Sequence, residues 1–142
     1  TSFTVETVFP KGAAFSQWLV NVGASKAPGQ LVIAKAQKSA KVANAPVAQP
    51  WVSGTGAIQY MSVNTPVEMA ATPENQCGRF IHTDLHVAGN STSSSDQGTP
   101  FPGGCDNGEL TPEEKALAFM IFDLSNCVMQ EDQKPKPPVI VK

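Results

Sequence analysis

The sequence predicts a domain of the α/β class, and three observations carry that prediction. Segments of alternating or β-branched apolar residues, typical of strands, are interleaved with two segments of helical periodicity. The clearest helix signal lies near the C-terminus, where the capping-box sequence Thr111-Pro112-Glu113-Glu114 precedes seven consecutive apolar residues, 116–122. A length of 142 residues is that of one ordinary domain with a real core.

In the first half of the chain we expect a strand, a helix and a second strand. Residues 1–8 are β-branched and roughly alternating, which predicts a short strand that Pro10 and Gly12 end. Residues 13–22 repeat apolar side chains at helical spacing, and Gly23 is placed to end that helix. The apolar segment 30–34 then predicts a buried strand, so that this order reads as an αβ unit.

The middle of the chain predicts further strands. Residues 35–50 are rich in alanine and lysine, and we expect irregular structure there with one short strand near Val42. Trp51 begins an extended segment that ends at Gly54, and residues 57–63 alternate like a strand. A moderate loop connects 57–63 to the strand expected at 79–87, so the two are predicted to pair antiparallel.

The C-terminal helix is expected over residues 112–126. Because its centre is apolar on every side, we expect a sheet to cover one side and another element to cover the other. The preceding segment 88–104 is long and low in complexity, which indicates either a flexible flap or a contact loop for a neighbouring subunit. We assign residues 1–129 to one α/β domain, or to the later half of a larger one, and residues 130–142 to a proline-rich tail.

Composition excludes several classes of function. The net charge is −2 and Arg79 is the only arginine, so the chain lacks the basic face of a nucleic-acid-binding protein. No stretch approaches the eighteen or so apolar residues of a membrane span. The low charge and a surface rich in Ser, Thr, Asn, Gly and Pro favour a secreted, cell-surface or periplasmic protein.

Any chemistry in this chain is expected on the strand 79–87, which carries both histidines. Alternation places His82, Asp84 and His86 on one face. Imidazole and carboxylate groups suit zinc, so these three residues are the candidate metal ligands; the alternative is a structural hydrogen bond between histidine and aspartate. The nearest hydroxyl, on Thr83, points to the opposite face, so no nucleophile for a hydrolytic site is evident.

The three cysteines are too widely spaced for a CxxC metal site and indicate one disulfide and one remaining thiol. If the strand 79–87 and the helix 112–126 run in opposite directions, the end of the helix lies beside the start of the strand. That arrangement favours a Cys77–Cys127 disulfide and leaves Cys105 unpaired or free for an intermolecular bond.

Several segments together resemble the C-terminal region of large uncharacterised exported bacterial proteins, which often carry carboxypeptidase-regulatory-like domains upstream. The resemblance rests on Phe9-Pro10-Lys11-Gly12, on Trp18-Leu19-Val20-Asn21-Val22-Gly23, on 77–87, on Phe101-Pro102-Gly103-Gly104-Cys105 and on 110–127. It covers most of the chain and implies an exported bacterial protein, but it implies no activity.

More remotely, the order of elements is similar to glutamine-amidotransferase-like domains of the trehalose-utilisation type. Gly78, Arg79 and His86 match that pattern, which implies a partial flavodoxin-like or amidotransferase-like sandwich with some antiparallel strands. The catalytic cysteine of true amidotransferases occupies a strand-turn-helix elbow, and no cysteine here has that context.

We therefore expect a non-catalytic, exported structural or interaction module that assembles with other chains or with the rest of its precursor. The expected partner is a protein or a second copy, and no cofactor is required by this interpretation. The alternative is a degenerate or split hydrolase or amidotransferase-like domain that binds zinc through His82, Asp84 and His86.

Overall fold

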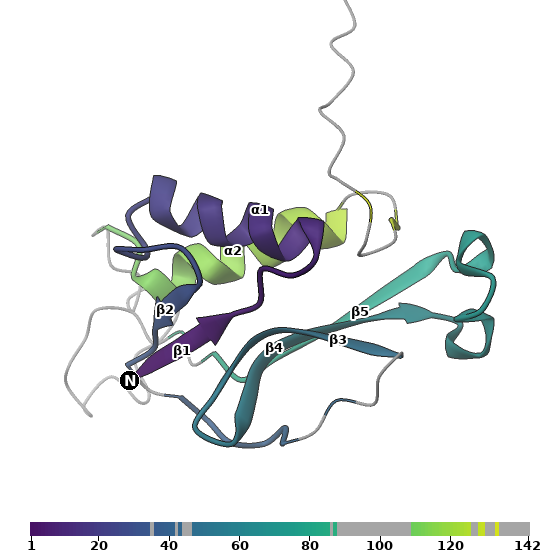
Figure 1. Ribbon diagram of the computed structural model, residues 1–142, viewed down its shortest axis with the longest axis horizontal. Helices are drawn as coiled ribbons and strands as arrows, with labels where there is room; N and C mark the ends of the chain where they lie inside the picture. Colours follow the sequence, from purple (N-terminus) through teal and green to yellow (C-terminus); the bar gives the residue numbers. More distant parts are fainter. Residues whose placement is uncertain are drawn as a thin grey trace, which may run out of the picture.

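The computed structural model describes residues 1–34, 36–41, 43, 47–85, 87, 109–125, 128–129 and 133. In the first half one helix separates the first two strands and two more strands follow directly, and the last strand and the last helix come in the second half (Figure 1). In chain order the elements are β1 (Ser2–Val5), α1 (Pro10–Asn21), β2 (Gln30–Val32), β3 (Ala48–Gly54), β4 (Ala57–Thr65), the short 3-10 helices η1 (Val67–Met69) and η2 (Pro73–Asn75), β5 (Gly78–Thr83) and α2 (Pro112–Ser125).

The described strands form one five-stranded sheet in the order β2-β1-β3-β4-β5, and both helices lie on the same face of it (Figure 1). The predicted mixed α/β class is confirmed. All four strand pairings are antiparallel, so a flavodoxin-like sandwich, which needs a parallel sheet, is not confirmed. The predicted antiparallel pairing of the strands 57–63 and 79–87 is confirmed as β4 with β5.

The path of the chain after α1 explains why β1 and β2 are antiparallel although a helix connects them. The Gly29 amide donates a 2.7 Å hydrogen bond to the hydroxyl of Ser16, in the middle of α1. The Gly29 carbonyl accepts a 2.9 Å bond from the amide of Val5, at the end of β1. The loop therefore runs back along the helix, and β2 starts at the same end of the sheet from which α1 departed.

An aromatic cluster forms the centre of the core. Trp51 is fully buried and stacks on Tyr60 with ring centroids 4.9 Å apart, while Phe9 meets it edge-on at 5.0 Å. The Trp51 indole N–H donates a 2.8 Å bond to the hydroxyl of Ser62 on the neighbouring strand. Its one polar atom is thus satisfied, which permits full burial between the sheet and the helices.

Helix α1 begins earlier than predicted and ends as predicted. Pro10 and Gly12 lie inside the first turn instead of interrupting the chain before it. Proline is favoured at that position, and a Cβ at residue 12 would collide with the Glu6 carbonyl oxygen and the Phe9 ring. At the other end Gly23 has a positive φ of 70°, and the amides of residues 23 and 24 bond back to the last turn in the Schellman pattern.

Helix α2 confirms the predicted capping box. The amide of Glu114 donates to the Thr111 hydroxyl at 3.2 Å, and the Glu114 carboxylate accepts from the Thr111 amide at 2.7 Å. Ala116 and Met120 are buried in the core, but Ile121, Phe122 and Leu124 are exposed. The expectation that α2 is covered on both sides is therefore wrong for its last two turns.

Strand β5 is shorter than the predicted strand 79–87. It ends at Thr83, and Leu85 forms an isolated bridge with Ala36, in the segment that follows β2. The predicted alternation is confirmed where it can be followed, because the Arg79 side chain and Ile81 pack on the helix side while Phe80 is exposed.

Val42 and the segment 88–104 lie outside the described residues. In the part of the chain that the structure describes, neither helix combines the length and apolar character that crossing a membrane requires.

Candidate functional site

The structure brings two of the three candidate metal ligands together. His82 is the penultimate residue of β5 and Asp84 follows the strand, and the Nε2 atom of His82 lies 3.3 Å from Oδ1 of Asp84. His86 lies outside the described residues. Within the described ranges no group of three or more histidine, cysteine, aspartate or glutamate side chains is placed to hold a metal ion. Two ligands are fewer than a zinc site uses, so the metal site stays a prediction.

The second oxygen of Asp84 connects the sheet to the segment that follows β2. Oδ2 accepts hydrogen bonds from the backbone amides of Ser39 at 2.7 Å and Ala40 at 3.3 Å. The carboxylate therefore supplies acceptors to a stretch of chain that has little regular structure of its own. This is the arrangement of a structural aspartate, with His82 as a second neighbour.

The protonation state of Asp84 agrees with that role. Burial by itself raises the pKa of its carboxyl, but the hydrogen bonds from Ser39 and Ala40 and the nearby imidazole of His82 lower it by more. The pKa therefore lies below the ordinary value of 3.8, and the group is ionised at neutral pH. A general acid needs a raised pKa, so Asp84 is unsuited to that task.

A buried cluster of charged side chains lies between α1, α2 and β5, and the sequence analysis did not identify it. Asp123, near the end of α2, has Oδ1 3.2 Å from the Lys11 ammonium and Oδ2 2.7 Å from Nε of Arg79. The three side chains are 9%, 8% and 4% exposed. Arg79 also donates from Nη1 to the Asn64 side chain at 3.0 Å, and its guanidinium lies 5.7 Å from the centre of the Trp51 ring. One carboxylate thus joins both helices to the first residues of β5.

Two features of the sequence could have indicated this cluster. Asp123 lies in the last turn of α2, where a negative charge opposes the helix dipole and so needs a cation nearby. Lys11 begins the buried stripe of α1 that continues through Phe15 and Leu19. The contact of Arg79 with Asp123 places the end of the C-terminal helix beside the start of the histidine-bearing strand, which is the arrangement assumed for the Cys77–Cys127 pairing.

Two further polar contacts fix the beginning of α2. The buried carboxylate of Glu113 accepts a 2.6 Å hydrogen bond from the amide of Ala34, just beyond β2. Lys115 donates a 2.9 Å bond to the Val22 carbonyl at the end of α1, where helix carbonyls lack partners within the helix. Both side chains are held by backbone groups of the fold.

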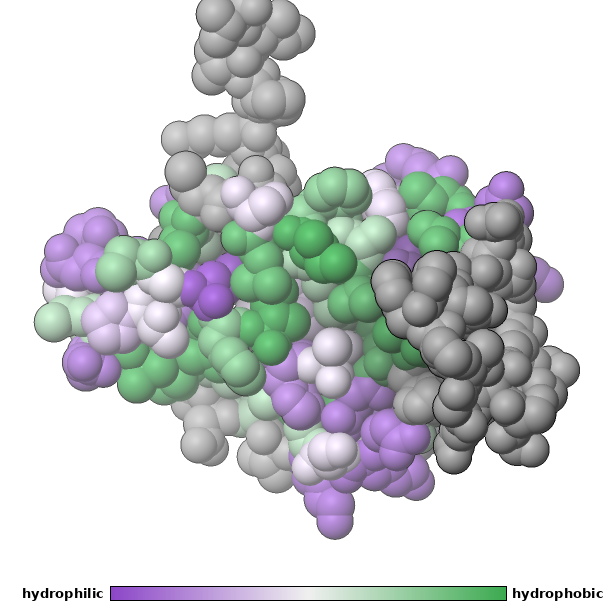
Figure 2. All heavy atoms as spheres, turned by 180° about the vertical axis from the view of Figure 1, so that it is seen from behind, coloured by the Kyte–Doolittle hydropathy of each residue, from purple (hydrophilic) through white to green (hydrophobic). Residues whose placement is uncertain are grey.

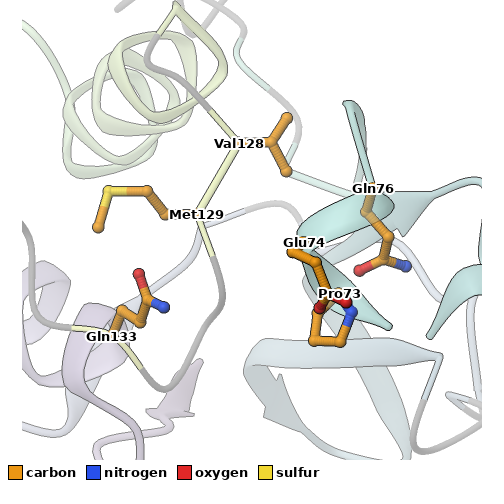
Figure 3. A pocket seen from close by; sticks show the side chains of 6 residues that line it. All are labelled: Pro73, Glu74, Gln76, Val128, Met129 and Gln133. Carbon is orange, nitrogen blue, oxygen red and sulfur yellow. The ribbon is translucent and has the colours of Figure 1, made fainter. Parts of the chain in front are cut away.

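The described cysteine is exposed, and a pocket lies beside it. Cys77 carries a free thiol; Cys105 and Cys127 lie outside the described residues, so the predicted Cys77–Cys127 pairing stays a prediction. The pocket has a volume of about 230 Å³ (Figure 3). One wall comes from η2 and the residue before Cys77, and the other from the chain beyond α2; the lining residues are Pro73, Glu74, Gln76, Val128, Met129 and Gln133. Glu74 is the only ionisable residue among these described lining residues, which therefore supply no acid–base pair.

Comparison of the chain with models of known families, with curated proteins and with solved structures finds no match. The function is therefore argued from the geometry of the molecule.

Proposed function

We propose that this chain is a non-catalytic structural or interaction module of an exported protein, which assembles with other chains or with the rest of its precursor. One observation carries the proposal: buried charged groups of the described chain are engaged in holding the fold together, while large apolar side chains of α2 and β5 face solvent. Asp84, Glu113 and Asp123 illustrate the first half of that observation. Ile121, Phe122 and Leu124 illustrate the second.

The proposed place of action is the cell surface, the secreted fraction or the periplasm of a bacterium. The low net charge and the exposed cysteine support it, because cysteines available for disulfides are typical of oxidising compartments. The partner in this proposal is a protein, either a second copy or another chain.

Two measurements on purified protein test the proposal. Light scattering gives the mass of the particle, and elemental analysis gives its metal content. An assembly that holds no stoichiometric metal supports an interaction module. A monomer with one zinc ion per chain contradicts it.

A second candidate is a degenerate or split hydrolase or amidotransferase-like domain that binds zinc through His82, Asp84 and His86. The observation that favours it is the 3.3 Å approach of His82 to Asp84. A partial flavodoxin-like sandwich belongs to this candidate and needs parallel strands beyond the described ones. Its test is stoichiometric zinc that is lost on His82→Ala while the far-UV circular dichroism spectrum stays unchanged.

A further inference from the structure

The two edges of the sheet differ in how well they are protected from pairing with another strand. The edge strand β2 has only three residues, whereas β5 has six, and its register with β4 is unbroken from Gly78 to Thr83. Natural edge strands are protected by short length, bulges, proline or exposed lysine. Strand β5 contains no lysine or proline, and the side chain of its one charged residue, Arg79, is buried beside Asp123.

The hydrogen-bond pattern shows which backbone groups of β5 face the free edge. Asp84 donates to the Gln59 carbonyl at 2.9 Å, directly after the pair Tyr60–Thr83. Because hydrogen-bonded and non-hydrogen-bonded pairs alternate in an antiparallel ladder, the even-numbered residues of β5 bond to β4. The amides and carbonyls of Ile81 and Thr83 therefore point away from the sheet, where no described strand pairs with them.

Exposed apolar side chains flank this edge on both faces of the sheet. On the open face Phe80 is 54% exposed. On the helix face α2 contacts the start of β5 through Asp123, and its residues Ile121 and Leu124 are 57% and 45% exposed. Seen from behind, the molecule has a band of hydrophobic residues that crosses its middle (Figure 2). The band starts at the arm that β4, η1, η2 and β5 form (Figure 1).

The helical period places Ile121 and Leu124 on the side of α2 away from α1. Lys115 and Phe119 define the side toward α1, because they contact the Val22 carbonyl and the Trp18 ring. At about 100° per residue, Ile121 and Leu124 lie well over 90° around the helix from that side. They are therefore available to a partner that approaches the helix from the side opposite α1.

We propose that β5 pairs antiparallel with β5 of a second copy of this chain, which joins the two sheets and brings the two α2 helices together. The inference rests on the proposed function and names its partner and its surface. A two-fold register centred on Ile81 satisfies the outward amides and carbonyls of both strands, and it places Phe80 opposite His82 of the second copy.

The character of the surface favours a second copy over a charged partner. A two-fold interface brings each patch against itself, so exposed like charges would repel. The outward side chains of β5 and of the last two turns of α2 include no lysine, arginine, aspartate or glutamate. The exposed parts of Phe80, Ile121 and Leu124 together supply roughly 300 Å² of apolar area, which suits the core of an interface of about 800 Å² per partner.

Sedimentation equilibrium of the full chain in a reducing buffer, which removes intermolecular disulfides, tests the proposal. The wild type is expected at twice the 15.0 kDa of one chain. Ile121→Lys places a charge at the two-fold contact. Thr83→Pro removes an outward amide and no backbone hydrogen bond to β4, although it also removes the 3.3 Å bond from the Thr83 hydroxyl to the Gln59 carbonyl. Each is expected to raise the dissociation constant of the dimer at least about tenfold.

Val32→Lys is the matched control, because Val32 lies on the opposite edge strand with the same 57% exposure as Ile121. It is expected to leave the dissociation constant unchanged, and circular dichroism verifies that each variant is folded. If Thr83→Pro does not fold, Ile121→Lys, at an exposed position, decides alone.

A wild-type monomer at every concentration overturns the pairing. An assembly that persists unchanged in Ile121→Lys also overturns it, but leaves the proposed function in place with another surface. A zinc-bearing monomer overturns both.

Discussion

At the scale of single residues, the arrangement around Asp123 matters most for stability. Two cations from different elements approach one carboxylate in a region that water barely reaches. A buried ion pair adds little compared with well-packed apolar residues, yet removal of one partner leaves a buried charge without compensation. Asp123 is therefore expected to be needed for stability.

We predict that Asp123→Ala lowers the free energy of unfolding by about 3–5 kcal/mol, because Lys11 and Arg79 then lose their shared carboxylate. Urea unfolding followed by tryptophan fluorescence measures the change. Glu68→Ala, at an exposed acidic residue, is the control and should change stability by less than about 0.5 kcal/mol. Equal effects of the two substitutions would refute a special role for the cluster.

A second prediction at this scale concerns the pH dependence that Asp84 gives to the fold. Its pKa is lower in the folded than in the unfolded chain, so its contribution is complete above the unfolded value and is lost as pH falls through the folded value. The stability difference between wild type and Asp84→Asn is expected to be constant above about pH 5 and to shrink below the ordinary pKa of 3.8. Urea titrations at a series of pH values measure it, and a difference that grows on acidification contradicts the assignment.

At the scale of secondary-structure elements, local sequence signals correctly predicted the start of α2 and the end of α1. The capping box at Thr111 and the glycine at 23 each have a backbone mechanism that works within a few residues, so both were predictable. The start of α1 was missed because Pro10 and Gly12 read as breakers, whereas proline fits a first helical turn and Gly12 permits close contact with the Phe9 ring.

The capping box gives a testable prediction at this scale. Thr111→Ala removes the hydroxyl that accepts the hydrogen bond from the Glu114 amide. It is expected to lower the free energy of unfolding by about 1 kcal/mol. Thr111→Ser keeps a hydroxyl at the same place and should retain most of the stability. Thermal unfolding of the two variants measures the difference, and equal losses would show that the cap contributes nothing.

At the scale of the whole molecule, the features that the sequence could not predict depend on contacts between residues that are far apart in the chain. The antiparallel run of β2 depends on Gly29 bonding to both Ser16 and Val5, and no local pattern encodes that contact. The mixed α/β class and the pairing of β4 with β5 were predictable from alternation and loop length. For the charge cluster the sequence could indicate that Asp123 needs a cation, but not that Lys11 and Arg79 both supply one, because the three residues come from three separate elements.

The predicted Cys77–Cys127 disulfide also belongs to this scale. Gln76 and Val128, the neighbours of these cysteines in sequence, line one pocket (Figure 3). In Cys105→Ser protein oxidised in air, peptide mapping without reduction should recover the 77–127 bridge. The bridge should raise the free energy of unfolding by about 2–4 kcal/mol over the reduced form. Recovery of two free thiols after oxidation would contradict the pairing.

Native mass spectrometry of the reduced wild-type protein tests the central claim most directly, because one spectrum reports both the number of chains and any bound metal. The interaction-module account predicts a metal-free species at a whole multiple of 15.0 kDa, with two chains as the dominant form. A single chain that carries one zinc ion would contradict it.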